Sequence, residues 1–494
     1  MARQGFDNDQ YLKLQSQHIR ERIAQFGGKL YLEFGGKLFD DFHASRVLPG
    51  FEPDSKIRML AQMKDSAEVI IAINAADIEK NKVRGDLGIT YDSDVLRLID
   101  AFRSMELYVG SVVVTQYSGQ PAADAFQARL EQLGVRVYRH YPIAGYPHNI
   151  AHIVSDEGFG KNQYIETSRP LVVVTAPGPG SGKMATCLSQ LYHEYRRGVK
   201  AGYAKFETFP VWNLSLDHPV NIAYEAATVD LGDVNAIDPF HLESYGVSAV
   251  NYNRDIEVFP VLKAAMEKIM GTCPYKSPTD MGVNTIASAI IDDDAVRSAS
   301  EKEIVRRYFK AAAATRRTGS GEEETAKLDF LMRKAGIDTN LSPAHSAALL
   351  KAETSSGQAG AIELPDGRVV TGKTSALLNA PSSVLLNALK AQADIADDIY
   401  VISNDALKPI CYLRTERLGH KNPHLHPNET LIALSVSSLT NPLAATCIEA
   451  AEGLRGCDAY FSSIITDEDE RLYRSLGINV CCEPRYETKR SDLD

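Results

Sequence analysis

The strongest constraint on the fold is an apolar strand that runs directly into a glycine-rich turn and then into a helix. The run LVVVTA begins at Leu171, the turn PGPGSGK spans 177–183, and helical periodicity follows from Met184 to Arg197. Four more apolar runs of strand length alternate with helical stretches and begin at Glu68, Ser111, Val135 and Lys200. Strands that alternate with helices form crossover units and hence parallel sheets. We therefore predict an α/β protein with mostly parallel sheets and flanking helices.

The 494 residues, 44% of them apolar, suffice for two to four domains. We expect an N-terminal α/β domain at 1–165, a P-loop-like α/β unit at 166–259, a helical connector or insert at 260–355 and a C-terminal α/β domain at 356–494. In the first, KLYLEFGGKLFDDF predicts a hairpin around its two glycines. In the last we expect a hairpin in AIELPDGRVVTGK, a helix around Leu385, strands at DIYVIS, LIALSVSS and AYFSSII, and a helix from Leu443 to Leu454.

Charge and hydropathy exclude several classes of partner. The 53 basic and 64 acidic residues give a formal net charge of −11 without a basic stripe, and duplex nucleic acid requires clustered Lys and Arg. No apolar run approaches the roughly 20 residues that span a bilayer. The seven cysteines are scattered and are interpreted as reduced thiols. We expect a cytoplasmic protein that forms a homo-oligomer, with the helical segment 260–355 contacting a neighbouring subunit.

The glycine-rich turn has the chemistry of a phosphate site. A strand, a turn and a helix in this order present backbone N–H groups and the positive end of the helix dipole to an anion. Gly178, Gly180 and Gly182 form the turn, and Lys183 stands where a P-loop lysine reaches the terminal phosphates. The pattern predicts binding of ATP or another phosphorylated metabolite.

The turn also departs from G-x-x-x-x-G-K-[ST]. Pro177 replaces the first glycine, and Met184 replaces the hydroxyl residue that would hold Mg²⁺. Ser181 is the better-placed substitute, because Thr186 lies about 200° further round the helix than position 184. A turn that only packs a helix against a sheet stays open as an alternative.

Two residues of the following strand separate phosphate chemistry from dinucleotide binding. GPGSGK lacks the third glycine of the dinucleotide fingerprint, whose ribose-binding acid would be Glu207. Lys205 lies two residues earlier and so on the same face of the strand. This lysine makes a phosphate-handling enzyme the better interpretation.

The run from Val172 to Thr208, VVVTAPGPGSGKMATCLSQLYHEYRRGVKAGYAKFET, resembles the opening unit of the dethiobiotin synthetase group of P-loop enzymes. The resemblance implies that Lys183 matches the loop lysine and Lys205 the second-strand lysine, although Ala204 separates Tyr203 from Lys205 here. Over its whole length the chain also resembles a conserved bacterial family of about 500 residues, a domain of unknown function, through strings such as YLEFGGKLFDDFHASRVLPGF and DPFHLESYG. That resemblance implies a bacterial, cytoplasmic protein and no particular activity.

Possible metal ligands occur in two stretches. Asp230 and Asp233 belong to a polar stretch that runs to Glu257, and carboxylates near phosphate usually hold Mg²⁺ or act as bases. Solvated turns and helix caps remain the alternative for them. His420, His424 and His426 form an H-x₃-H-x-H pattern that fits a transition metal, an anion contact or a plain surface loop.

These observations favour an enzyme, possibly an ATP-dependent ligase or phosphotransferase, that binds a phosphorylated small molecule with Mg²⁺. Lys183 would hold the ligand, and Lys205 would stabilise charge on a carboxylate or phosphoryl group in transit. Two alternatives remain: a nucleotide- or phosphate-sensing protein without turnover, and a nicotinamide-dependent enzyme that uses Glu207.

Overall fold

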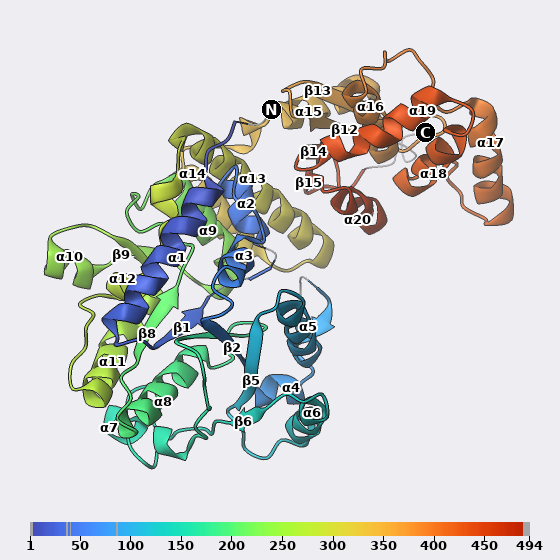
Figure 1. The fold of residues 1–494 in the computed structure, drawn as a ribbon. Coiled ribbons are helices and arrows are strands. Elements are labelled where there is room, and N and C mark those ends of the chain that lie inside the picture. Colours follow the sequence, from blue (N-terminus) through green and yellow to red (C-terminus); the bar gives the residue numbers. More distant parts are fainter. Residues whose placement is uncertain (1–2, 36–37, 40, 85–86, 488–494) are drawn as a thin grey trace. The chain divides into compact units, whose positions relative to one another are not determined.

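The computed structural model describes residues 3–35, 38–39, 41–84 and 87–487, which form two compact units (Figure 1). The N-terminal unit contains Gln4–Glu225 and Gly232–Val296, and the C-terminal unit contains Ala226–Leu231 and the chain from Arg297 onward. Segments 1–165 and 166–259, which the sequence separates, both contribute strands to one sheet of the N-terminal unit.

That sheet has seven strands, all parallel, and confirms the predicted α/β class. In spatial order the strands are β11 (Gly282–Val283), β8 (Gly202–Phe206), β1 (Leu30–Phe34), β7 (Leu171–Thr175), β2 (Ala67–Asn74), β5 (Tyr108–Thr115) and β6 (Val137–Arg139). The five apolar runs of the sequence correspond to β2, β5, β6, β7 and β8. Such runs suit a parallel sheet because its strands are buried on both faces.

β1 corrects one prediction. Its neighbours are β7, with Leu30 opposite Leu171, and β8, with Leu30 opposite Gly202, and both pairings are parallel. The hairpin predicted around Gly35 and Gly36 is therefore wrong, although Gly36 itself lies outside the described residues. The two glycines suggested a β-turn and a hairpin, but both strands that pair with β1 come from distant parts of the chain.

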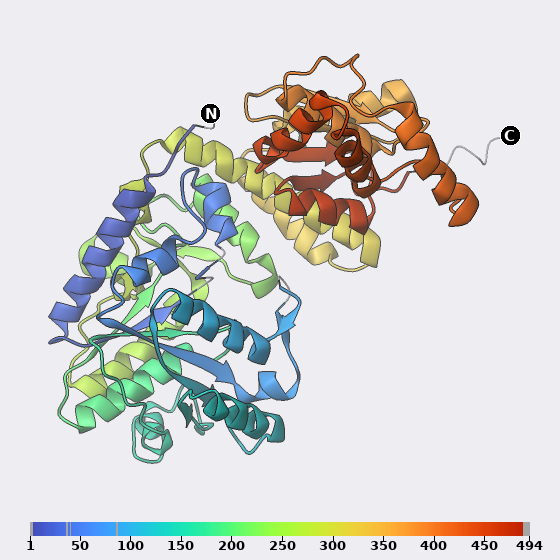
Figure 2. The ribbon, with the colours of Figure 1, turned by 45° about the vertical axis from the view of Figure 1, so that its right-hand side comes forward.

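Helices lie on both faces of this sheet (Figure 2). α8 (Lys183–Arg196) contacts β1, β7 and β8, and its Glu194 accepts a 2.7 Å hydrogen bond from the Tyr31 hydroxyl of β1. On the opposite face Phe34 and Phe206 stack 4.0 Å apart, and Lys56 of α3 (Ser55–Ala61) lies over the Phe206 ring. Side chains of β1 and β8 with the parity of Tyr31 therefore point toward α8.

The other helices of this unit include α1 (Asn8–Gln25), which contacts β8 and β11, α5 (Tyr91–Ser104), which contacts β2 and β5, and α6 (Pro121–Gln132), which contacts β6. α11 (Asn253–Met270) contacts α8. The helix predicted from Met184 to Arg197 is confirmed as α8.

The order of the strands places the glycine-rich turn at a special point of the sheet. The chain leaving β7 crosses β1 to reach β8, whereas the chain leaving β2 goes the other way, to β5. The two connections diverge at the neighbouring carboxyl ends of β7 and β2. Open α/β sheets bind their ligands at such a switch point.

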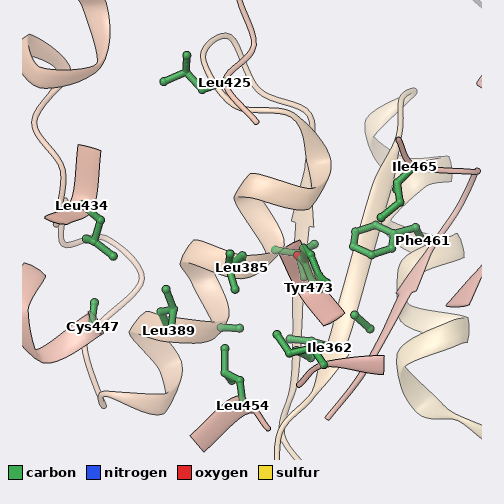
Figure 3. Close-up of a cluster of buried hydrophobic side chains, with 14 of the residues drawn as sticks. Ile362, Leu385, Leu389, Leu425, Leu434, Cys447, Leu454, Phe461, Ile465 and Tyr473 are labelled. Carbon is green, nitrogen blue, oxygen red and sulfur yellow. The ribbon is translucent and has the colours of Figure 1, made fainter. Parts of the chain in front are cut away.

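The C-terminal unit is built on a mixed sheet in the order β13 (Val369–Lys373), β12 (Ala359–Glu363), β14 (Asp458–Phe461) and β15 (Asn479–Cys482). Its core contains Ile362 and Phe461 from the sheet, Leu385 and Leu389 from α16 (Ala380–Gln392), and Leu434 (Figure 3). The hairpin β12–β13, the helix around Leu385 and the strand at AYFSSII are confirmed.

Two predicted strands of this unit are wrong. LIALSVSS belongs to a helix, α18 (Pro427–Ser437), and DIYVIS contains no strand. α18 starts with a capping box between His426 and Glu429 and has Pro427 in its first turn, both of which favour a helix. The predicted helix from Leu443 corresponds to α19 (Pro442–Glu449) and the 3₁₀ turn Ala450–Leu454 that follows it.

Between the two sheets the chain is mainly helical, with α13 (Asp293–Thr318), α14 (Glu322–Lys334) and α15 (Pro343–Ser355). Across the part of the chain that the structure describes, no helix is both long and apolar enough to cross a membrane.

Candidate functional site

Each glycine of the turn meets a separate steric requirement. Gly180 and Gly182 have φ angles of +76° and +85°, in the left-handed region that residues with a Cβ avoid. A Cβ on Gly178 would stand 2.2 Å from the hydroxyl oxygen of Tyr91. Glycine therefore fits all three positions without backbone strain and without displacing Tyr91.

Hydrogen bonds hold the turn by its carbonyl groups. The Ser181 hydroxyl donates to the carbonyl of Gly178 (2.9 Å), the Thr115 hydroxyl to that of Ser181 (2.8 Å) and the Asn74 amide to that of Gly180 (3.3 Å). The Ser181 side chain is fully buried, so it closes the turn. Its predicted role as a Mg²⁺ ligand would require the loss of this hydrogen bond.

Unlike the carbonyl groups of the turn, the first backbone N–H groups of α8 form no hydrogen bonds among the described residues. Within the described ranges, no residue accepts a hydrogen bond from the backbone N–H of Lys183, Met184 or Ala185. These are the donors that a helix leaves open at its N-terminus, and together they form the positive end of the helix dipole. An anion placed there would receive several hydrogen bonds at once.

A cavity of about 30 Å³ lies beside this N-terminus, lined in part by Thr115, His140, Asn162 and Thr186. Thr186 is fully buried, and its hydroxyl oxygen has no hydrogen-bond partner among the described residues. Burial lowers the pKa of His140 to about 4, so this ring is neutral, and its Nε2 lies 3.2 Å from the carbonyl oxygen of Gln163. The cavity has room for one water molecule or one ligand hydroxyl.

Lys183 follows the turn as the first residue of α8. Burial lowers the pKa of its ammonium, Glu33 raises it and Lys205 lowers it further. The two lysines therefore lie close enough to repel each other. No described residue forms a hydrogen bond or an ion pair with the Lys183 ammonium. A half-buried cation without a hydrogen-bond or ion-pair partner favours a bound anion.

Lys205, in contrast, lies inside a network at the carboxyl end of β8. Its ammonium forms an ion pair with Asp255 in the first turn of α11, lies 3.0 Å from a carboxyl oxygen of Glu207 and donates a 3.4 Å hydrogen bond to the Tyr252 hydroxyl. Burial alone would lower the pKa of Lys205, but Asp255 and its other neighbours hold it well above the ordinary value. Lys205 is therefore a permanently charged centre of the network.

The opposite side of this network is formed by β1. Glu33 stands opposite Lys205 in the sheet register and accepts a 2.7 Å hydrogen bond from the Tyr203 hydroxyl. Tyr203, Lys205 and Glu207 alternate along β8, so they share the face that α8 covers. Two lysines and three carboxylates thus gather between the sheet edge and the starts of α8 and α11.

Glu207 has the most unusual protonation in this group. Burial raises its pKa to about 8, Lys205 opposes the change and Asp255 adds to it. One carboxyl oxygen lies 3.0 Å from Lys205, while the other is buried without a hydrogen-bond partner among the described residues. Near neutral pH this side chain is a carboxylic acid that can give up a proton, as general acids and bases require.

The residues predicted to bind a metal do not belong to this group. Asp233 is buried and forms an ion pair with Arg254 at 2.6 Å, and Asp230 is exposed in the turn Val229–Leu231. The histidines do not form a metal site either: His426, which precedes α18, has its Nδ1 2.8 Å from a carboxyl oxygen of Asp469, His424 is half-buried and His420 is exposed. Within the described ranges no three His, Cys, Asp or Glu residues form a group that could hold a metal ion.

The sequence did not single out Glu33 or Tyr252, and it gave Asp255 only as one of many polar residues in its stretch. Glu33 had a detectable signal, because it is the one charged residue in the apolar strand LYLEF. Asp255 and Tyr252 had none, since only the folded chain brings the start of α11 to the end of β8.

Comparisons with known proteins find relatives over nearly the whole length of the chain. The family described as "Domain of unknown function DUF1846, N-terminal" matches residues 4–336, and its C-terminal counterpart matches residues 340–491. A UPF0371 protein of Streptococcus thermophilus (strain ATCC BAA-491 / LMD-9) is 56% identical over 487 residues and covers 99% of both chains. A UPF0371 protein of Streptococcus pneumoniae serotype 19F (strain G54) is 56% identical over 490 residues with the same coverage.

Proposed function

Because the chain belongs to the bacterial family of the domain of unknown function DUF1846, whose description carries no activity, we propose its function from its own side chains. It is an enzyme that binds a phosphorylated small molecule at Gly178–Lys183 and moves a proton through Glu207. The observation that carries this proposal is Lys183, which is half-buried, has no hydrogen-bond or ion-pair partner for its ammonium among the described residues, and begins a helix whose first three N–H groups are open.

The lysines have different roles in this proposal. Lys183 contacts the phosphate directly, as a point charge beside the N-terminus of α8. Lys205 is a positioning residue, because its ammonium is already bound to Asp255 and Glu207 and so fixes where the acidic proton lies. It also supplies positive charge close to a group that becomes negative during the reaction.

ATP and Mg²⁺ are the more specific form of the same proposal. A ligase or phosphotransferase would place the β- and γ-phosphates on the turn, and Mg²⁺ would arrive with those phosphates. Asp233 is bound to Arg254 and Asp230 is exposed, so the phosphates and water would supply most of the metal's ligands. Smaller phosphorylated metabolites need no metal at this site.

The dinucleotide alternative receives less support. In a dinucleotide fold the strand after the glycine-rich turn lies next to the first strand and carries the ribose-binding acid. Here β1 lies between β7 and β8, and the candidate acid, Glu207, is buried against Lys205.

A thermal-shift screen tests the binding step. Inorganic phosphate, pyrophosphate, ATP, NAD and phosphorylated sugars are each added with and without Mg²⁺, and unfolding is followed by the fluorescence of Trp212, the only tryptophan. A ligand that binds the native state raises the melting temperature by mass action. The increase should vanish in Lys183→Met and persist in Lys13→Met, which changes an exposed lysine of α1. An equal increase in Lys183→Met would refute the site.

Glu207→Gln then separates an enzyme from a sensing protein. Glutamine keeps the shape of the neutral acid, so binding of the ligand should change little, while turnover should fall by at least about 100-fold, the usual contribution of a general acid or base. Turnover is measured as loss of the ligand that the screen identifies. Unchanged turnover would remove Glu207 from the mechanism, and binding without any turnover in the wild type would favour the sensing protein.

A further inference from the structure

α18 turns an apolar side outward that the proposed site does not explain. Ile432 and Val436 lie four residues apart on one face of α18 and are exposed, and so is Leu439 in the turn that follows the helix. The other side of the helix, with Ala433 and Leu434, lies in the core of the C-terminal unit (Figure 3). The helix is therefore apolar on both sides, and only one of them has a partner among the described residues.

Neighbouring segments add to this surface. A hydrogen bond of 3.1 Å from Asn441 to the carbonyl of Val401 keeps Tyr400 close to the end of α18. At the start of α18 Glu429 accepts two 2.8 Å hydrogen bonds from Arg414, which lies in the π-helical turn Leu413–Arg417. This turn follows α17 (Asn404–Tyr412) and α18 contacts both α17 and α19. The exposed residues nearby are Tyr400, Tyr412, Leu413 and Leu418.

The exposed area is large for a monomer. These seven side chains, which we call the α18 face, are between 51% and 85% exposed. With roughly 200 Å² for a tyrosine and about 120 Å² for an aliphatic side chain, they leave on the order of 700 Å² of apolar surface in water. The largest patch on a typical monomer is about 300–600 Å². A stable dimer of standard size buries about 800 Å² on each partner.

The charge of this region limits what can cover it. From Pro427 to Ile448 the only charged residue is Glu429, and Arg414 already binds it. Exposed charges of both signs, Glu416, Arg417 and Lys421, stand beside Leu413 and Leu418 in the sequence. Nucleic acids and anionic membranes need clustered positive charge, which this mixture does not provide. A centre poor in charge with a polar rim is characteristic of an interface between protein subunits.

We propose that the α18 face binds the same face of a second copy of this chain across a two-fold axis, so that the protein is a homodimer. A two-fold axis brings a single apolar patch against itself and requires no second complementary surface. The site at Gly178–Lys183 has no part in this argument. The inference also replaces the helical segment 260–355, which the sequence had suggested for subunit contact, with a specific helix of the C-terminal unit.

Light scattering coupled to size-exclusion chromatography tests the dimer on the full chain. The wild type should give twice the 54.2 kDa of the chain at micromolar concentration. Ile432→Glu combined with Val436→Glu should raise the dissociation constant by at least about 100-fold and give the monomer mass, because it brings four charges to the centre of the contact. Phe330→Glu is the matched control, since Phe330 is as exposed as Ile432, at 61%, but lies on α14 in segment 260–355.

Circular dichroism confirms that each variant is folded, and the milder pair Ile432→Ser and Val436→Ser replaces the glutamates if they do not fold. A wild type that stays a monomer at about 50 µM would overturn the proposal, because interfaces of standard size have dissociation constants from about micromolar to about picomolar. A dimer that survives both pairs of substitutions would overturn it as well. Dissociation by Phe330→Glu alone would move the contact to segment 260–355.

Discussion

Replacing Glu207 with glutamine keeps the shape of the neutral carboxyl group and removes its titration. In the folded protein burial raises the pKa of Glu207 to about 8, whereas a glutamate in an unfolded chain titrates near about 4.3. Between these pH values the folded state holds a proton that the unfolded state has released. A folded pKa above the unfolded one means that this contribution to stability is complete at low pH and is lost as pH rises.

The size of the effect follows from the same two pKa values. Each pH unit in this window removes about 1.4 kcal/mol from the free energy of unfolding, so the wild type loses up to about 5 kcal/mol between about pH 4.3 and about pH 8. Glu207→Gln lacks this dependence. The difference between the two proteins therefore isolates Glu207 from all other titrating groups.

Urea unfolding from about pH 5 to about pH 9, followed by Trp212 fluorescence, measures this difference. Trp212 is a local probe, because its Cζ2 atom and Glu207 Oε2 both lie within 3.4 Å of the place where a Cβ on Gly282 would stand. The wild type should lose stability relative to Glu207→Gln up to about pH 8. Above that pH the difference in unfolding free energy between the two proteins should stay constant. Parallel pH curves for the two proteins, or a wild type that gains stability with rising pH relative to the variant, would refute the reasoning.

Three further predictions concern the turn and its lysines. Gly182→Ala should cost about 1–3 kcal/mol of unfolding free energy, because φ is +85° and its Cβ would stand 3.1 Å from Thr115. Gly180→Ala has a similar φ but open space around the Cβ, so it should cost only about 1 kcal/mol in the same urea titration. Lys183→Met should raise the unfolding free energy of the ligand-free protein by about 1 kcal/mol, because burial disfavours the Lys183 ammonium, and a loss of stability relative to Lys13→Met would contradict that assignment. Lys183→Ala and Lys205→Ala should each weaken ligand binding in calorimetric titrations, and the double variant should lose less than the sum of the two, whereas additive losses would show that the lysines do not share a ligand.

The central sheet was predictable because its strands are buried on both faces. LVVVTA and the run at β2 are nearly continuous apolar sequences of strand length, and the glycine turn with Gly198 marked both ends of α8. The same rule failed for LIALSVSS, because a short apolar run also fits a helix: α18 has apolar residues on its buried side (Ala433, Leu434) and on its exposed side (Ile432, Val436). The capping residues His426 and Glu429 were the local signal for a helix there.

The candidate site was predictable only where it is local. Lys183 and the three glycines lie within six residues, and Lys205 and Glu207 share one face of one strand, so periodicity alone relates them. Their surroundings depend on long-range pairing: Glu33 stands opposite Lys205 because β1 lies between β7 and β8. The pairing of Asp255 with Lys205 and of Asp233 with Arg254 likewise depends on tertiary structure.

The position of a bound anion tests the central claim most directly. Tungstate, an electron-dense mimic of phosphate, is diffused into crystals of the full chain, and its anomalous signal locates the ion. The account predicts a tungsten peak at the start of α8, placed so that the oxygens of the ion accept charge-assisted hydrogen bonds of about 2.8 Å from the first backbone N–H groups and from the Lys183 ammonium. A peak at another place in crystals of a protein that binds tungstate in solution, with the N-terminus of α8 empty, would contradict it.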